Sequence, residues 1–185
     1  SEIMRSLAEV GLTSREACGN AVRNVMCSPL AGVCKDEEFD VTPYAIATAK
    51  FFLRNPLNQS LPRKFKFNFT CCEKHGMARM VDVGLIPQMR TINGQSRRGF
   101  KIFLGGGLGN KSFVGHQLED WTPEEDLLYT SIATIRIFDR LGDRKHLERN
   151  RMRYLVDSMG WEQFQSLVLK ERALVKMAQS VIVKL

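Results

Sequence analysis

The sequence of 185 residues contains no long apolar run, no internal repeat and no low-complexity segment. Because a helix needs about 18–20 successive apolar residues to span a bilayer, we expect no membrane-spanning segment and no membrane partner. The hydrophobic content of 44% is enough for a buried core. The chain has neither a methionine at position 1 nor a signal segment, so we expect a single domain over residues 1–185 that is a piece of a longer protein.

Cysteine is scarce and irregularly spaced. The chain has an odd number of cysteines, and two of them are adjacent: Cys18, Cys27, Cys34, Cys71 and Cys72. An adjacent pair seldom forms a disulfide, so we expect reduced thiols and a cytoplasmic location. The spacing matches none of the usual zinc or ferredoxin signatures. Cys71 and His75 stand in a Cys-x3-His relation, but such a pair alone is a weak signal, and we predict no metal ligands in this chain.

Two further absences limit the class of ligand. The sequence has no nucleotide-binding GxGxxG or P-loop pattern, so we do not expect a nucleotide site. Aromatic residues amount to only 9%, which does not indicate the stacking platform of single-strand binders. The net charge of +7 and the pI near 9.3 nevertheless fit nucleic acid, a membrane surface or an anionic small molecule.

What the sequence does contain is a strict alternation of polar and aromatic residues over 64–69. Side chains alternate between the two faces of a strand, so the three phenylalanines share one face while Lys64 and Lys66 share the other. The two lysines then lie about 6.6–6.8 Å apart, at two rises of the strand. This polar face is either a solvated surface or a wall of cations, with Arg63 as a third charge, that faces an anionic ligand.

Two other stretches leave a structural and a functional interpretation open. Arg23 lies between Asn20 and Asn24, and it is either a plain surface charge or a guanidinium presented to an oxyanion. Residues 105–109 read Gly-Gly-Gly-Leu-Gly, which lets backbone N–H groups come close to a neighbour. The glycine run is therefore either a tight bend or a surface that packs against a flat cofactor.

The remaining pattern predicts both helices and strands. Helices are expected over residues 2–11, 40–53, 122–142 and 143–160 and around 164–168, with a stub at 181–185. Strands are expected over 64–69, 80–86 and 99–104, with a basic connection over 90–98 and a long structured loop over 12–40. On the helix from Asp143, the residues Lys145, Arg149 and Arg153 would form a basic stripe.

With these stretches in order, the chain resembles the first siroheme-binding half-domain of the nitrite and sulfite reductase family. The resemblance covers roughly residues 10–170 and rests on the order and spacing of several motifs. These motifs are Ala17–Val25, Ser28–Gly32, Asp40 with Pro43, Leu61–Lys66, Asp82-Val83, Gly99-Phe100 leading to Gly105–Leu108, and Gly142–Arg144 leading to Arg153.

The resemblance implies an α+β fold in which helices pack on a mixed β-sheet and the C-terminal segment is helical. It implies that a second, pseudo-symmetric half of the same reductase holds siroheme together with this half. The implied activity is the six-electron reduction of sulfite to sulfide, or of nitrite to ammonia, with electrons from ferredoxin or a similar donor.

The resemblance also assigns roles to the cations. By position, Arg23, Lys64 and Lys66 match the substrate-side cations of the family. Fixed cations would polarise the S–O or N–O bond while oxygen leaves as water. Lysines beside an anion are also proton sources, because the opposite charge keeps them protonated.

A second group of residues is expected to contact the cofactor. By position, Arg63 matches a family residue near the siroheme carboxylates. A basic domain would attract these carboxylates. We expect the same contact from Asn24, Gly105, Gly106 and Gly107.

The chain departs from the family in its cysteines. Family members bind a 4Fe-4S cluster through a Cys-x5-Cys and a Cys-x3-Cys set in the second half, and this sequence has no such set. We therefore expect no cluster ligands in this chain and no turnover by the chain alone. Lys66 favours sulfite, because sulfite-reducing members tend to keep lysine there and plant-type nitrite reductases tend to carry asparagine. The alternatives are a nitrite reductase, a structural half whose site has decayed, and a basic nucleic-acid-binding module.

Overall fold

The structure is a computed structural model that describes residues 1–74 and 77–179. The strands are β1 (Val22–Cys27), β2 (Phe65–Phe69), β3 (Val83–Ile92), β4 (Gln95–Leu104), β5 (His116–Gln117) and β6 (Thr122–Pro123). The helices are α1 (Glu2–Glu9), α2 (Thr42–Phe52), α3 (Leu127–Leu141), α4 (Met152–Met159) and α5 (Trp161–Gln179), with the 3₁₀ turns η1 (Pro56–Asn58), η2 (Ala78–Met80) and η3 (Glu124–Asp126). The predictions about His75 and about residues 181–185 lie outside the described residues.

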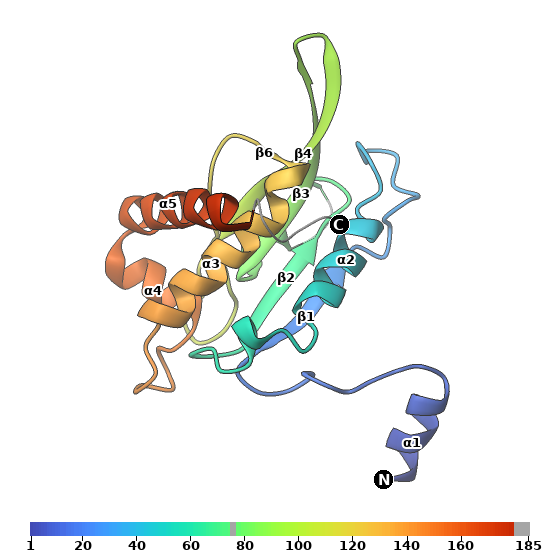
Figure 1. The fold of residues 1–185 in the computed structure, drawn as a ribbon, viewed down its shortest axis with the longest axis vertical. Helices are drawn as coiled ribbons and strands as arrows, with labels where there is room; N and C mark the ends of the chain where they lie inside the picture. The colour runs from blue at the N-terminus through green and yellow to red at the C-terminus, as the bar shows by residue number, and fades with distance from the viewer. Residues whose placement is uncertain (75–76, 180–185) are drawn as a thin grey trace.

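The strands form one mixed sheet, which confirms the expected α+β class (Figure 1). The order along the sheet is β1-β2-β3-β4-β5, and β6 pairs with β4. β1, β2 and β3 run parallel, whereas β4 runs antiparallel to β3. Across the described ranges, no helix combines the length and the apolar character needed to cross a membrane.

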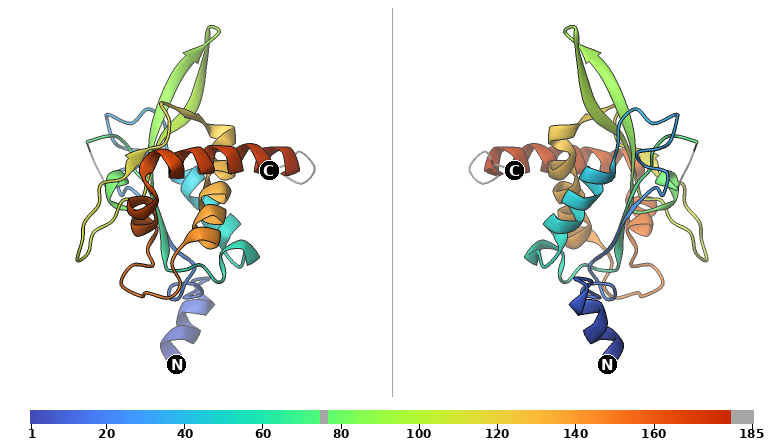
Figure 2. Two further views of the ribbon diagram at one scale, coloured as in Figure 1. Left: turned by 90° about the vertical axis from the view of Figure 1, so that its left-hand side faces the viewer. Right: turned by 90° about the vertical axis from the view of Figure 1, so that its right-hand side faces the viewer.

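Helices α2, α3 and α5 cover one face of the sheet, loops cover the other, and α1 lies apart from the sheet (Figure 2). Phe65, Phe67 and Phe69 of β2 are fully buried, as their alternation predicts. The ring of Phe67 stacks on Phe52 of α2 at 5.4 Å between centroids, and the ring of Phe65 lies 5.7 Å from Phe138 of α3. The aromatic face of β2 therefore forms the core, and its lysine face points to the loop side.

The prediction of one long loop over residues 12–40 is wrong, because β1 lies within it. β1 pairs with β2 along its length, and its register shifts between Val22 and Asn24. Val22 is buried, whereas Asn24 is exposed. The strand carries no alternating pattern, because it is an edge strand and the bulge breaks the period of two.

The strand predicted over residues 80–86 is β3, which begins later, at Val83, and continues through Pro87 to Ile92. Proline lacks an N–H group, but β2 pairs with β3 only as far as Leu85, so Pro87 needs no donor on that side. The predicted basic connection over 90–98 is also wrong, because these residues form a hairpin that projects beyond the sheet (Figure 1). Asn93 and Gly94 make its turn with φ values of 52° and 77°.

Two predicted helices begin later than expected. Residues 122–123 form β6, and α3 begins at Leu127 after η3. The second of the two helices, α4, begins at Met152 rather than at Asp143. The Asp143 carboxylate accepts hydrogen bonds from the backbone N–H groups of Lys145 and His146, which stabilises a turn there. The expected basic stripe therefore does not exist, because only its last member lies on a helix.

Candidate active site

The ends of four strands meet at one end of the sheet. Val22 of β1 pairs with Phe65 at the start of β2, and Val83 at the start of β3 pairs with Leu104 at the end of β4. Because β1, β2 and β3 run parallel, the residues that precede or open these strands lie at the same edge. The glycine run follows β4 at this edge as well. Residues as far apart in the sequence as Val22 and Leu104, which are 82 positions apart, thus lie at one edge.

Basic side chains gather at this edge, and we call Arg23, Arg63, Lys64, Lys66 and Arg151 the cation cluster. The pKa of Lys64 reflects how close these five side chains lie to one another. Its burial, followed by the positive charges of the other four members, lowers the pKa of its amine below the ordinary value. The structure therefore brings together the three cations with a predicted substrate role. Asn24 lies beside them, because it pairs in register with Lys66.

Part of the cation cluster opens into a cleft of about 250 Å³. Four basic residues line the cleft, Arg63, Lys64, Arg151 and Arg153, together with one acidic residue, Glu148, whose carboxylate pairs with a neighbouring arginine. Like charges repel when they are held close together. A cleft of this composition is suited to bind an anion with several negative groups.

A buried ion pair between Asp82 and Arg151 holds part of the cation cluster in place. Asp82 is completely buried and accepts hydrogen bonds from Arg151 Nη2 at 2.8 Å and from the backbone N–H of Lys66 at 3.0 Å. Burial raises the pKa of the Asp82 carboxyl, and the Arg151 guanidinium opposes that rise. Asp82 thus fixes both the start of β2 and the guanidinium of Arg151. The sequence reasoning missed Arg151, because no local pattern links it to a residue 69 positions away.

The glycine run makes room for neighbours within the chain. A Cβ atom at Gly106 would lie 2.3 Å from the carbonyl oxygen of Arg79, and a Cβ atom at Gly107 would lie 2.9 Å from Arg153 Nη1. Gly105 has a φ of +81°, which side chains disfavour. Each of the three glycines thus has a packing reason. The predicted contact of Gly105, Gly106 and Gly107 with a cofactor stays a prediction.

Arg153 is the most deeply buried arginine of the cleft, with 6% of its surface exposed. Its Nε and Nη1 atoms are buried without a hydrogen-bond partner among the described residues. Its guanidinium lies 4.8 Å from the ring centroid of Tyr154, a cation–π contact. Two buried donors without a partner are unusual in a folded protein, so they single out this arginine.

Arg23 is held differently from the lysines. Its Nη2 atom lies 3.1 Å from the sulfur of Cys18, and its Nε atom is buried without a hydrogen-bond partner within the described ranges. Arg23 as a whole residue is half-buried, and it also lines a second pocket beside Glu16 and Lys50. The predicted role of Arg23 toward an oxyanion stays a prediction.

Fold and site together define an α+β domain with a basic edge. Residues 18–177 match the family described as nitrite and sulphite reductase 4Fe-4S domain. The chain belongs to this family.

Relatives of both substrate types are similar to the chain. A chloroplastic ferredoxin–nitrite reductase of Arabidopsis thaliana is 31% identical over 174 residues, which are 91% of this chain and 29% of the relative. The sulfite reductase (ferredoxin) 1 of Mycolicibacterium paratuberculosis is 30% identical over 170 residues, which are 92% of this chain and 30% of the relative. The chain thus spans less than a third of the length of these curated relatives.

A solved structure confirms the fold. The Mycobacterium tuberculosis NirA protein superposes with a TM-score of 0.82 at 28% identity, covering 94% of this chain and 31% of that one. This likeness extends over nearly all of the described residues. The expected helices packed on a mixed sheet are therefore the fold of the family.

Proposed function

We propose that this chain is the first siroheme-binding half-domain of a reductase that converts sulfite to sulfide with electrons from ferredoxin or a similar donor. The observation that supports the proposal is the pairing of β1 with β2, which brings Arg23, Lys64 and Lys66 to one edge of the sheet, and the charges of Arg23 and Lys66 help to lower the pKa of Lys64. A second half of the same reductase would complete the site.

The cleft fits a cofactor that is rich in carboxylates. Arg63, Arg151 and Arg153 line it, and Arg153 has two unpartnered nitrogen atoms within the part of the chain that the structure describes. Arginine binds carboxylates well, because its planar fork of N–H groups matches the two carboxylate oxygens. When bound, siroheme supplies the iron that holds the substrate and delivers the electrons.

A 4Fe-4S cluster does not fit the cysteines of this chain. The described cysteines form one group of three, Cys34, Cys71 and Cys72, whose sulfur atoms all lie within 4.8 Å of one another. Such a cluster takes four thiolates, each on a different iron atom, so its sulfur ligands lie farther apart. We place the cluster ligands outside this chain.

The cations contribute charge and protons to the proposed reaction. Arg23 and the two lysines would bind the oxyanion and stabilise the charge that develops on the oxygen as its bond breaks. Lys64 is suited to donate a proton, because a lowered pKa makes its ammonium group a stronger acid. Each departing oxygen needs protons to leave as water.

Nitrite is the second candidate substrate, since relatives of both kinds are about equally similar to the chain. Lys66 supports sulfite, because a dianion gains more from an additional cation than a monoanion does. A basic nucleic-acid-binding module is less well supported, because Phe65, Phe67 and Phe69 are buried and unavailable for stacking on bases.

The test is an absorption spectrum of the full-length protein with and without sulfite. We expect Soret and visible bands of siroheme that shift when sulfite is added, and a smaller shift in a Lys64→Ala variant. A full-length protein that is purified with its iron but lacks these bands would contradict the proposal. Binding to a generic DNA duplex with a steep salt dependence would support the nucleic-acid alternative instead.

A further inference from the structure

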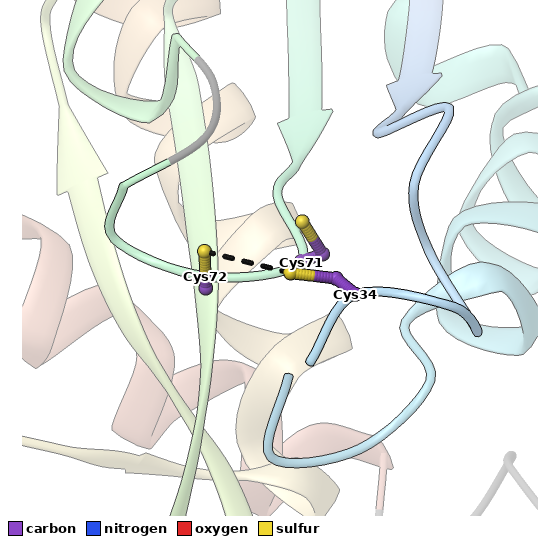
Figure 3. A group of neighbouring side chains, drawn as sticks. All are labelled: Cys34, Cys71 and Cys72. Atoms are coloured by element: carbon purple, nitrogen blue, oxygen red, sulfur yellow. Dashed lines mark hydrogen bonds between the residues drawn. The ribbon is translucent and has the colours of Figure 1, made fainter. Parts of the chain in front are cut away.

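Three cysteines come together at the opposite end of the strands from the cation cluster. The sulfur atoms of Cys34, Cys71 and Cys72 all lie within 4.8 Å of one another, and Cys34 and Cys72 are 3.9 Å apart (Figure 3). Cys71 and Cys72 are buried, and Cys34 is half-buried. We call these residues the thiol group. The proposed reaction uses none of them.

The fold holds the thiol group in place through contacts around it. Cys71 and Cys72 follow β2 almost directly, and Cys34 lies in the loop after the neighbouring strand β1. The backbone N–H of Ser28 donates a hydrogen bond to the carbonyl oxygen of Phe69 at 2.8 Å, which ties the ends of the two strands together. Farther along, Lys74 Nζ lies 3.0 Å from Asp36 Oδ2. The two segments that carry the cysteines are thus fastened on both sides of the thiol group.

The thiol group is separate from the cation cluster. The cluster lies at the start of β2, and the cysteines lie just beyond its end. The five residues of β2 span about 13 Å at a rise of 3.3 Å per residue. A ligand of the thiol group therefore does not share the site proposed for sulfite.

We propose that Cys34, Cys71 and Cys72 bind a single thiophilic metal ion, for which Zn²⁺ is the fitting choice. Four ligands around zinc at 2.3 Å place neighbouring sulfur atoms about 3.8 Å apart. The distance of 3.9 Å between Cys34 and Cys72 agrees with that geometry. Binding replaces the three S–H protons with the metal, the protons pass to solvent, and no electrons are transferred. A water molecule would take the fourth position.

The thiol group also has an entry path. Cys72 lines a cleft of about 370 Å³, together with the acidic residues Asp36, Glu38 and Glu73. Lys74 and Lys101 border the same cleft and pair with Asp36 and Glu73. Glu38 then leaves one net negative charge in the cleft, which attracts a divalent cation. An ion and a water molecule can thus reach the sulfur of Cys72 from solvent.

The test measures zinc in the full-length protein and in a cysteine variant. Protein incubated with Zn²⁺ under reducing conditions and then desalted should carry one zinc more per molecule than a Cys34→Ser variant treated in the same way. A Cys27→Ser variant is the matched control, because Cys27 lies on β1 and outside the thiol group, and it should keep the zinc. Addition of Co²⁺ should give thiolate-to-cobalt absorption in the wild type and the control only.

Several outcomes would overturn the proposal. Equal zinc in the wild type and in a Cys34→Ser variant with an unchanged circular dichroism spectrum would exclude Cys34 as a ligand. A disulfide between Cys34 and Cys72 that persists in the reducing buffer would leave no ligand set. An excess of iron and sulfide beyond one siroheme and one cluster, lost in the variant, would indicate an iron–sulfur cluster instead. If Cys34→Ser does not fold, Cys34→Ala is measured in its place.

Discussion

Lys64 is the residue on which the other charges of the cation cluster act most directly. Its burial and the charges of Arg151 and Arg23 lower the pKa of its amine. A folded-state pKa below the unfolded value means that protonated Lys64 costs stability at neutral pH. This cost begins to fall when the pH rises above the folded pKa, and it is gone above the unfolded pKa. Repulsion of this kind, retained in a folded protein, is a feature of functional sites.

We predict that an oxyanion in the cluster reverses this shift. Sulfite or sulfate should raise the pKa of Lys64, because an opposite charge favours the ammonium form. The measurement is the pH dependence of amine labelling at Lys64 in the full-length protein, followed by mass spectrometry. Replacement of one neighbouring cation, as in Arg23→Gln, should raise the same pKa without any anion. An unchanged labelling profile with sulfite would show that the anion binds elsewhere.

Lys66 should decide between the two substrates. We expect Lys66→Asn to lower sulfite turnover roughly 10–100-fold, by loss of one cation from the anion site, and nitrite turnover much less. Steady-state rates with both anions measure this difference. Lys101→Asn is the matched control, because Lys101 also lies on the loop side of the sheet but pairs with Glu73. Equal losses with both substrates would contradict the role of Lys66 in selectivity.

At the scale of elements, the turn after β4 and helix α4 depend on each other. Arg153 of α4 occupies the space where a side chain at position 107 would lie. The glycine and the arginine are 46 residues apart in the sequence, so each explains the other only in the folded chain. The arginine lines the basic cleft because the glycine leaves room for it.

We therefore predict coupled effects of substitutions at these two positions. Gly107→Ala should lower the free energy of unfolding by about 1–3 kcal/mol, because its Cβ atom overlaps the guanidinium. In an Arg153→Ala background the same change should cost much less. Urea unfolding of the four proteins measures the coupling. Additive effects would show that the overlap is relieved elsewhere.

The sequence predicted those elements whose pattern is local. The alternation in β2 depends on residues within a few positions of one another and is confirmed, and the helix expected over 122–142 is present as α3, although it begins later. β1 was missed because its pairing with β2 is what makes it a strand. The hairpin over 90–98 was missed because its charged residues read as a connection, although the Asn93-Gly94 turn was a usable signal.

The sequence predicted those residues of the candidate site that lie in local motifs, and it missed those that depend on long-range contacts. Arg23, Lys64 and Lys66 follow from motifs that resemble a known family, and the structure brings them together. The ion pair between Asp82 and Arg151 joins two segments that no short motif connects. The thiol group likewise forms only when the ends of β1 and β2 lie side by side. The spacing of residues in the sequence cannot predict groups such as these, because they form only when distant segments pair in the fold.

At the scale of the whole molecule, the two faces of the sheet differ. Helices α2, α3 and α5 lie over one face of the sheet, and loops lie over the other (Figure 2). The rings of Phe65 and Phe67 contact α3 and α2, so Lys66 lies on the opposite face. A core that includes Phe65, Phe67 and Phe69 lies entirely within this chain. The cation cluster, in contrast, lies at the edge of the sheet. The chain thus contains a core of its own, and its clustered cations lie outside that core.

We predict that the isolated chain folds but does not turn over sulfite. Its secondary structure by circular dichroism should match that of the structure, because the aromatic core is internal. Oxidation of a reduced dye with sulfite should be absent with the isolated chain and present with the full-length protein. Turnover by the isolated chain would show that the site needs no second half.

The short strand β2 has a consequence for how this chain can change in evolution. Its five residues carry phenylalanines on one face and a lysine on the other, begin beside the cation cluster and end beside the thiol group. An insertion or deletion of one residue within it would turn the phenylalanines toward the loops and displace both groups at once. Descendants of this sequence can therefore alter either group by substitution, but the length of β2 must be inherited unchanged.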